Sequence, residues 1–294
     1  MLLGHEIHFI TGKGGVGKST VAAAMALQLA RSGRKTLLVE LTEQSFFKDC
    51  FELTQITYQP QSISENLSVS SWKGNDCLKE YALYLLKSES LYKIFFENPI
   101  MQTFIRVAPT LQEIAILGKV TSQPRHHGPE MPFESIVVDG FATGHFLAMM
   151  RAPGGLAKTV QFGPMGEQSK GIDQCLRNSE LCKYHIVTLP EELPLKETLD
   201  LSSSLYSEFQ IQANVILNKM ISIPESIQNN LNPNIDSQNI NTSENIFTSY
   251  LQAQQFKQTQ AIDFLEKNKM AFRQLPWIFK NSFKLVAKSL ADFL

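Results

Sequence analysis

The sequence predicts an α/β fold, a doubly wound and mostly parallel sheet with a helical insertion. The first forty residues give a strand, a loop, a helix and a second strand in immediate succession. Further short apolar runs follow, each preceded by a stretch long enough to cross over to the next parallel strand. The insertion is indicated by residues 76–120, which carry no strand signal and repeat apolar side chains at helical spacing.

The opening elements follow from the order of apolar runs and glycines. An apolar run at residues 7–10 meets a glycine-rich segment, and the helical run at 21–30 ends before Gly33, a residue suited to the left-handed turn that closes a helix. A second apolar run at 35–39 completes a β-α-β unit. Its two strands are expected to be parallel and buried.

The rest of the chain predicts four more strands and two insertions. The strands are expected at residues 67–72, 135–139, 184–189 and 212–217. Within the helical insertion, Pro99 and Pro109 are predicted to begin separate helices, because proline is tolerated in a first turn. Residues 222–245, rich in Asn, Gln, Ser and Pro, predict a long polar loop. We therefore expect one domain over residues 1–294, with a helical subdomain at about 76–120.

Charge and composition exclude several classes of protein. The chain has 294 residues, with 27 Lys plus Arg and 28 Asp plus Glu, so its formal net charge of −1 gives no electrostatic reason to bind a nucleic acid. No basic leader and no apolar run of bilayer length is present, which predicts a cytoplasmic protein. The four cysteines form no CxxC pair, so we expect buried thiols and no structural zinc.

Residues 12–20 read GKGGVGKST and fit the phosphate-loop pattern GxxxxGK[ST], with a strand before it and a helix after it. Glycines let successive N–H groups point into one concavity at the start of the helix. Lys18 is suited to neutralise the β- and γ-phosphates, and the Ser19 hydroxyl to ligate Mg²⁺. The predicted cradle consists of Gly14, Gly15, Val16, Gly17, Lys18, Ser19 and Thr20.

Lys13 makes this loop more specific than the general pattern. The string GKGGVGKST resembles the deviant Walker A motif of a group of P-loop NTPases that includes the ArsA-type ATPases, which drive arsenite pumps or target tail-anchored proteins. In those proteins the first lysine reaches the nucleotide of the partner subunit. The resemblance implies that Lys13 acts in this way on the transition-state charge, and the alternative is a solvated loop lysine.

A second segment, IVVDGFATGH at residues 136–145, resembles the strand and switch II signature DTAPTGH of the ArsA-type ATPases. The resemblance implies that Asp139 holds Mg²⁺ through water, and that Gly144 brings a main-chain N–H close to the γ-phosphate. Two interpretations of His145 stay open, a phosphate sensor and a residue at a helix start.

Three more stretches extend the resemblance over nearly the whole chain. Residues 108–119 resemble the PGLDE…GK segment of the family's helical subdomain, and residues 187–198 its strand that ends in a proline-acid loop. Asn218 follows a strand, where the relatives carry the Asn that reads adenine. An amide can pair with adenine N6 and N7, so Asn218 is a candidate for base recognition, with a turn-forming Asn as the alternative. Pro276 lies where the relatives have a loop that closes on the base.

The chain departs from this family at two places. Residues 247–249 occupy the region of the zinc-sharing CxxC pair of the targeting members, so a zinc-linked dimer is not expected. The switch I pattern TDPAH has an Asp that positions the attacking water, and here Thr42 stands at that point. Glu40, two residues earlier, is a candidate for engaging Mg²⁺ or its waters, against the alternative of a strand-end carboxylate without a role.

The resemblance implies an ATP- and Mg²⁺-dependent dimeric ATPase whose nucleotide state changes a helical surface to target or position a partner protein. Lys13, Lys18, Glu40 and Asp139 would be catalytic, and Ser19 and Asp139 would hold the metal. We expect a homodimer or a heterodimer with a paralogue, slow hydrolysis, ATP or ADP as the ligand, and an unidentified client protein. The alternative is a nucleotide-binding switch or scaffold with slow or no hydrolysis. A metalloid-pump subunit would need cysteine ligands that the chain does not offer.

The last residues form two stripes at helical spacing. The apolar stripe is Phe279, Phe283, Val286, Leu290 and Phe293, and the basic stripe is Lys280, Lys284 and Lys288. The favoured interpretation is a final helix that packs on the sheet. The alternative is a basic amphipathic helix, so any membrane contact is expected to be peripheral.

Overall fold

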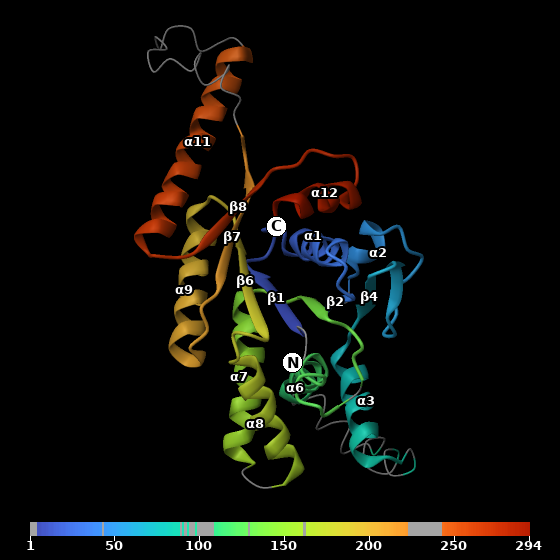
Figure 1. Cartoon of the computed structure of the whole chain (residues 1–294). Helices are drawn as coiled ribbons and strands as arrows, with labels where there is room; N and C mark the ends of the chain where they lie inside the picture. Colours follow the sequence, from blue (N-terminus) through green and yellow to red (C-terminus); the bar gives the residue numbers. More distant parts are fainter. Residues whose placement is uncertain are drawn as a thin grey trace.

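The computed structural model describes residues 5–42, 44–88, 90, 93, 98, 109–128, 130–160, 163–222 and 243–294. One sheet has the strand order β3-β4-β2-β5-β1-β6-β7-β8 (Figure 1). Its strands are β1 Glu6–Gly12, β2 Thr36–Glu40, β3 Gln61–Ser64, β4 Leu67–Ser71, β5 Ser135–Asp139, β6 Cys182–Thr188, β7 Asn214–Met220 and β8 Phe272–Pro276. All neighbouring pairs are parallel except β3 and β4. The predicted fold class is confirmed.

Helices cover both faces of this sheet (Figure 1). The described helices are α1 Lys18–Arg31, α2 Phe46–Cys50, α3 Gly74–Leu86, α6 Pro109–Val120, α7 Thr143–Thr159, α8 Pro164–Leu176, α9 Glu192–Phe209, α11 Ser243–Lys267 and α12 Phe283–Leu290. Buried side chains of α1 and α12 share one apolar core with the sheet, and those of α6, α7, α8 and α9 share a second. A third, smaller cluster joins α9 and α11 to β7. Parallel strands need this arrangement, since both of their faces are withdrawn from water.

The core on the α7 and α9 face is centred on aromatic rings. Phe9 of β1 is fully buried, stacks on Tyr184 of β6 at 5.2 Å between ring centroids, and meets Phe146 of α7 at 6.0 Å. The Tyr184 hydroxyl donates to the carbonyl of Leu176, which satisfies its polar end at 2.6 Å. The three elements are therefore joined at one point beneath the phosphate loop.

Phe9→Ala is expected to lower the free energy of unfolding by about 3–5 kcal/mol, because the change removes a buried ring and leaves a cavity that rigid strands cannot close. Urea unfolding followed by circular dichroism measures it. Phe256→Ala on α11 is the matched control; its side chain is 63% exposed, and a change within about 0.5 kcal/mol is expected. A loss below about 1 kcal/mol for Phe9→Ala would contradict this view of the core.

Three elements differ from the sequence-based expectations. The strands β3 and β8 were not predicted, because both lie at the sheet's edges and bury few of their side chains, so neither shows a continuous apolar run. Strand β6 begins at Cys182, two residues before the strand predicted at residues 184–189, and Cys175 lies in α8. All four cysteines are free and buried, as expected.

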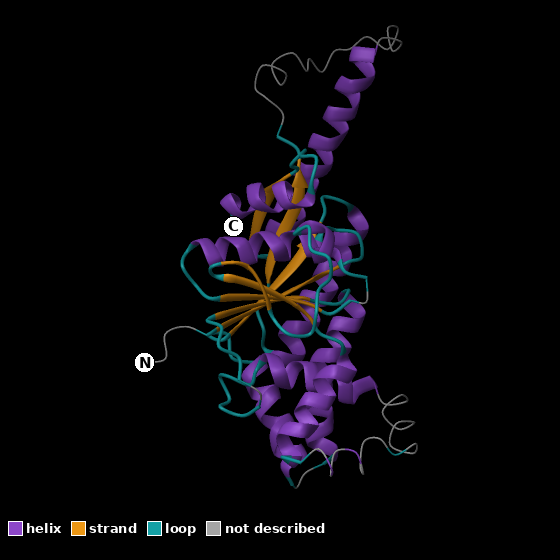
Figure 2. Ribbon diagram, turned by 90° about the vertical axis from the view of Figure 1, so that its right-hand side faces the viewer, coloured by secondary structure: helices purple, strands orange, loops and turns teal. Residues whose placement is uncertain are grey.

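The helical insertion is described only in part. Helix α3 begins two residues before the predicted span of about 76–120, and α6 begins at Pro109 as predicted. The two helices pack on each other, and α7 and α8 lie at the same end of the molecule (Figure 1 and Figure 2). Pro99 lies outside the described residues. Most of the predicted polar loop also lies outside them, and its last three residues begin α11, a long helix that projects from the sheet. The subdomain boundaries stay a prediction.

The apolar stripe at the carboxyl terminus is partly buried and partly exposed. Ala287 and Leu290 of α12 are buried against α1, whereas Phe279, Phe283 and Phe293 are exposed. The predicted final helix is present, and it packs chiefly on α1 while its buried side chains join the apolar core that α1 shares with the sheet. Among the helices of the described residues, none is both long and apolar enough to cross a membrane.

Candidate functional site

The glycine-rich loop joins the carboxyl end of β1 to α1, and two of its glycines have no substitute. Gly12 has φ +140°, and a methyl group there would lie 2.1 Å from the carbonyl oxygen of Val187 on β6. Gly17 has φ +96°, and a methyl group there would lie 2.6 Å from the Asn218 side chain. These backbone conformations and close approaches require glycine. The chain therefore turns sharply enough to enter α1 directly beneath the loop.

The remaining loop residues leave room for an anion. An added methyl group at Gly14 or Gly15 would meet no other atom within 4 Å. Helix α1 begins at Lys18 without a capping side chain and without an acidic residue in its first turn. Its first N–H groups and the positive end of its dipole therefore face open space, which is the arrangement that binds phosphate.

Lys18 lies within this loop, and its ammonium donates to the carbonyl of Lys13 at 3.0 Å. Burial lowers the pKa of Lys18, and the nearby Asp139 charge opposes that shift. Since a half-buried ammonium gains by meeting further negative charge, this lysine is suited to a phosphate oxygen.

Asp139 ends β5 beside the loop and is almost fully buried. Its Oδ1 has no hydrogen-bond partner among the described residues. Burial raises the pKa of Asp139 to about 6, the Glu40 charge adds to the rise, and the Ser19 hydroxyl and Lys18 oppose it. An orphaned carboxylate oxygen beside a hydroxyl is a hard-oxygen donor set that fits Mg²⁺. In the described part of the chain no three His, Cys, Asp or Glu residues converge on one point, so water and phosphate would complete the shell.

Glu40 lies beside Asp139, at the paired carboxyl end of β2, and is completely buried. Its Oε1 accepts from the main-chain N–H groups of Phe46 at 2.6 Å and Phe47 at 3.4 Å, so it anchors the start of α2. Its Oε2 has no partner within the described residues. Burial raises the pKa of Glu40. One oxygen thus has a structural role, and the other is available to the site.

Thr42 is exposed two residues beyond β2, and its hydroxyl donates to the carbonyl of Gln44 at 3.0 Å. This bond closes a local turn and does not reach the phosphate loop. The side chain therefore supplies no carboxylate to the site, whatever position the loop adopts.

Lys13 forms an ion pair with Glu197 of α9. The other Glu197 oxygen accepts from the Thr143 hydroxyl, at the start of α7, at 3.4 Å. Glu197 thus contacts both the phosphate loop and the helix that follows Asp139. Sequence reasoning did not identify Glu197 as a site residue, because its two partners lie 184 and 54 residues away along the chain.

The segment after Asp139 contacts the helical insertion through His145. Its Nε2 lies 2.9 Å from Oε1 of Glu113 on α6, and its ring stacks on Phe141 at 3.8 Å between centroids. Gly144, the second residue of α7, has open space around its Cα. His145 therefore links Phe141, two residues after Asp139, to α6. Neither interpretation of His145 from the sequence had included this contact.

Asn218 and Pro276 border one cavity together with Gly17 and Thr20. Its volume is about 590 Å³. The Asn218 amide donates to the carbonyl of Val16 at 2.9 Å, which supports the loop from below and leaves its Oδ1 available. Trp277 also lines the cavity and stacks on Phe279 at 4.8 Å. Trp277 was missed from the sequence, because the strand directly before it, β8, had not been predicted.

Comparison with known proteins places this geometry in a family. Residues 5–165 match the family model described as anion-transporting ATPase, ArsA_ATPase. The chain belongs to the ArsA ATPase family. It is similar to ATPase BagA of Mycobacterium tuberculosis, with 32% identity over 235 residues that cover 75% of this chain and 66% of that protein. It is also similar to putative arsenical pump-driving ATPase 2 of Aquifex aeolicus, with 26% identity over 256 residues, 76% of this chain and 82% of that protein.

The ArsA ATPase family model covers only some of the site residues. The phosphate loop, Glu40, Asp139 and Gly144 lie inside residues 5–165, whereas Asn218, Pro276 and Glu197 lie outside. A putative arsenical pump-driving ATPase of Halobacterium salinarum shares 25% identity over 241 residues, 76% of this chain and 36% of that protein. The chain thus spans just under two thirds of the mycobacterial relative and about a third of the haloarchaeal one.

Proposed function

We propose that this chain binds ATP and Mg²⁺, hydrolyses ATP, and uses its nucleotide state to change a helical surface that targets or positions a partner protein in the cytoplasm. The observation that carries the proposal is the open phosphate cradle at the start of α1, with Asp139 beside Ser19 and its Oδ1 without a partner among the described residues. The phosphate cradle, the Lys18 ammonium and the oxygens of Ser19 and Asp139 lie at one end of the sheet. Ligands of doubly wound folds bind at this end.

Different residues are proposed to bind different parts of the nucleotide. Main-chain N–H groups of residues 14–20 hold the phosphates, and the Lys18 ammonium leaves the Lys13 carbonyl to meet the terminal phosphates. Bound Mg²⁺ would add positive charge at the phosphates, held by Ser19 and Asp139. Asn218 and Pro276 would contact the base. Hydrolysis in such a site depends on positioning and charge more than on covalent chemistry.

Communication with the helical surface is proposed to run through His145. Gly144 has the room to move toward a γ-phosphate, and a shift of the α7 start would act on the His145 contact with Glu113 of α6. Because packed helices move as units, a small displacement there would reposition α6 and the helices packed on it.

A dimer completes the proposal, either of two identical chains or with a paralogue. The side chains of Lys13 and Glu197 are about one-third exposed, so the lysine is near the surface and held by one carboxylate. The role in trans comes from the resemblance to the ArsA-type ATPases. Release from Glu197 would free the lysine for a partner's nucleotide.

A second candidate function is a nucleotide-binding switch or scaffold with slow or no hydrolysis. It is favoured by Thr42, which brings no carboxylate, and by the use of one Glu40 oxygen to anchor α2. Both functions require nucleotide binding, and they differ in turnover. Prolonged steady-state assays with radiolabelled ATP, with Lys18→Ala as the blank, separate them.

Lys18→Ala is expected to weaken ATP binding about tenfold to hundredfold, because the change removes a charge-assisted contact to phosphate. Trp277 reports binding, since it is 40% exposed at the base cavity while Trp72 is buried. Titration of Trp277 fluorescence with ATP and Mg²⁺ measures the affinity, and Trp277→Phe verifies the source of the signal. Lys170→Ala, at an exposed position of α8, is the control that should bind like the wild type. Equal affinity of Lys18→Ala and wild type would overturn the proposed nucleotide site.

A further inference from the structure

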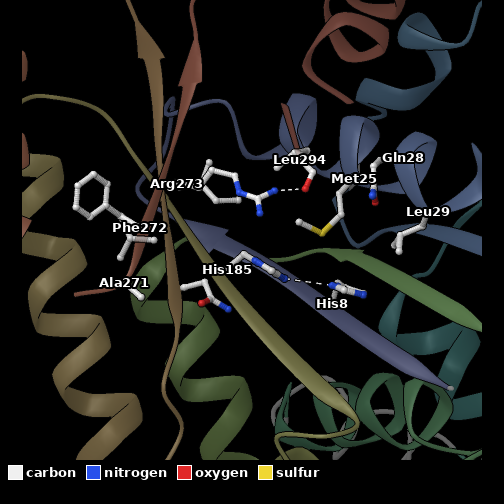
Figure 3. Close-up of a pocket in the computed structure, with 12 residues that line it drawn as sticks. His8, Met25, Gln28, Leu29, His185, Ala271, Phe272, Arg273 and Leu294 are labelled. Carbon is white, nitrogen blue, oxygen red and sulfur yellow. Dashed lines mark hydrogen bonds between the residues drawn. The ribbon is translucent and has the colours of Figure 1, made fainter. Parts of the chain in front are cut away.

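Two of the four cysteines, Cys175 and Cys182, meet where α8 ends and β6 begins. Cys175 lies in the last turn of α8, Cys182 is the first residue of β6, and both side chains are buried. On the opposite face of β6, His185 shares a cavity with residues of α1 (Figure 3). Because strand residues alternate between faces, Cys182 and Tyr184 face α8. The pair thus lies at the amino end of β6, whereas the phosphate loop follows the carboxyl end of its parallel neighbour β1.

The two thiols are in direct contact. Cys182 Sγ donates to the main-chain carbonyl oxygen of Cys175 at 3.4 Å, and it also faces Cys175 Sγ closely enough for a hydrogen bond between the thiols. The turn between them is fixed by Asn178, whose carbonyl accepts from the N–H groups of Leu181 at 3.1 Å and Cys182 at 2.8 Å. Sulfur atoms that already contact each other can bond without a large movement of the backbone.

The surroundings make the two thiols chemically different. The pKa of Cys175 is lowered because the Cys182 thiol can donate to its thiolate, and the Arg125 charge adds to this effect while burial opposes it. The pKa of Cys182 is raised by the same contact and by burial. Burial raises the pKa of Cys50 and of Cys77 to about 12. Cys175 therefore ionises most readily of the four, and the thiolate is the nucleophile in thiol–disulfide exchange.

Arg125 supplies the positive charge beside α8. Its Nη1 donates to Oε1 of Gln168 at 2.8 Å, and a methyl group added at Gly171, one turn before Cys175, would lie 3.7 Å from its Cδ. Its two other hydrogen bonds go to a threonine hydroxyl and a main-chain carbonyl. These three acceptors carry no charge, so they leave the guanidinium able to stabilise a thiolate at Cys175.

We propose that Cys175 and Cys182 form a redox-active dithiol, which a low-molecular-weight disulfide oxidises to an intrachain disulfide. The Cys175 thiolate attacks one sulfur of the oxidant, which forms a mixed disulfide and releases one thiol. Cys182 then loses its proton and attacks the Cys175 sulfur, which forms the intrachain bond and releases the second thiol. The protein thiols lose two electrons to the oxidant, and their two protons end on the two released thiols.

The disulfide fastens the end of α8 to the first residue of β6. Helix α8 packs on α7 and, through Oε1 of Gln168, accepts from Arg125 and from the Tyr81 hydroxyl of α3. Oxidation therefore links these packed helices covalently to the sheet. The dithiol is independent of the proposed ATPase activity, because neither cysteine lies at the phosphate loop.

Oxidation of the full chain with about 1 mM glutathione disulfide tests the proposal, with alkylation of free thiols and peptide mass spectrometry as the readout. Most chains should carry a disulfide between Cys175 and Cys182, and dithiothreitol should reverse it. Cys182→Ala should stop at the mixed disulfide of Cys175 with glutathione, whereas Cys175→Ala should form no intrachain bond. Cys50→Ala is the matched control of a buried thiol, and it should oxidise like the wild type.

Thermal unfolding gives a second readout. The oxidised wild type should unfold at a midpoint at least about 3 °C above that of the reduced protein, because the cross-link restricts the unfolded chain. Cys175→Ala should show no such shift on the same treatment. Free thiols at both positions after treatment with glutathione disulfide and with diamide, a disulfide that joins other cysteines instead, or an unchanged midpoint of the oxidised chain would each overturn the proposal.

Discussion

Replacing Lys13 with alanine is expected to lower ATP turnover by about 10³-fold or more while leaving the nucleotide affinity of a single chain nearly intact. A cation supplied in trans to a transferring phosphoryl group is worth about 10³–10⁵ in rate. Within one chain, Lys13 is paired with Glu197 instead of facing its own phosphate cradle. Loss of the Lys13 side chain should therefore lower ATP turnover by the dimer more than it lowers the nucleotide affinity of the monomer.

Three measurements examine this expectation. Single-turnover hydrolysis gives the rate, Trp277 fluorescence gives the affinity, and sedimentation with ATP and Mg²⁺ gives the association, which Lys13→Ala should weaken. Glu197→Gln should favour association, because it relaxes the hold on Lys13 without changing the shape of the side chain. A monomer under every nucleotide condition, alone and mixed with a paralogue, would contradict the dimer. Loss of binding by Lys13→Ala, as large as for Lys18→Ala, would contradict the role in trans.

Thr42→Asp is expected to raise a slow wild-type turnover by about 10²-fold. A general base must lie within hydrogen-bond reach of the attacking water, and a positioned carboxylate typically contributes about 10²–10⁴ in rate. A threonine hydroxyl cannot accept that proton. Thr42 is exposed in the loop after β2, so an Asp is accommodated without disturbing the core. Multiple-turnover assays at saturating ATP measure the gain, and Thr42→Asn is the control of equal size without the charge.

Glu40→Gln shows whether Glu40 has taken over the role of the missing carboxylate. The amide oxygen can still accept from Phe46 and Phe47, so α2 keeps its anchor, while the negative charge beside Asp139 is lost. We expect a further fall in rate with little change in ATP affinity. A fast wild type that is indifferent to Glu40→Gln and to Thr42→Asp would mean that the catalytic carboxylate lies elsewhere.

The sequence alone determined the elements that depend on residues close together in the chain. A strand, four glycines and a helix start at residues 7–20 predict the phosphate loop, because backbone conformations with positive φ and unpaired helical N–H groups depend on nearby residues. Asp139 could be assigned to the carboxyl end of a buried strand for the same reason. The resemblance to the ArsA-type ATPases was carried by these local strings, and the family match covers them.

Only the tertiary structure decided which distant side chains meet. The pairing of Lys13 with Glu197, the anchoring of α2 by Glu40 and the contact of His145 with Glu113 depend on strand order and on the way helices lie across the sheet. The contact between His8 and His185 requires β1 and β6 to be neighbours in the sheet, although they lie far apart in the chain. Hydrophobic periodicity records which face of an element is buried, but it carries no information about which partner covers that face.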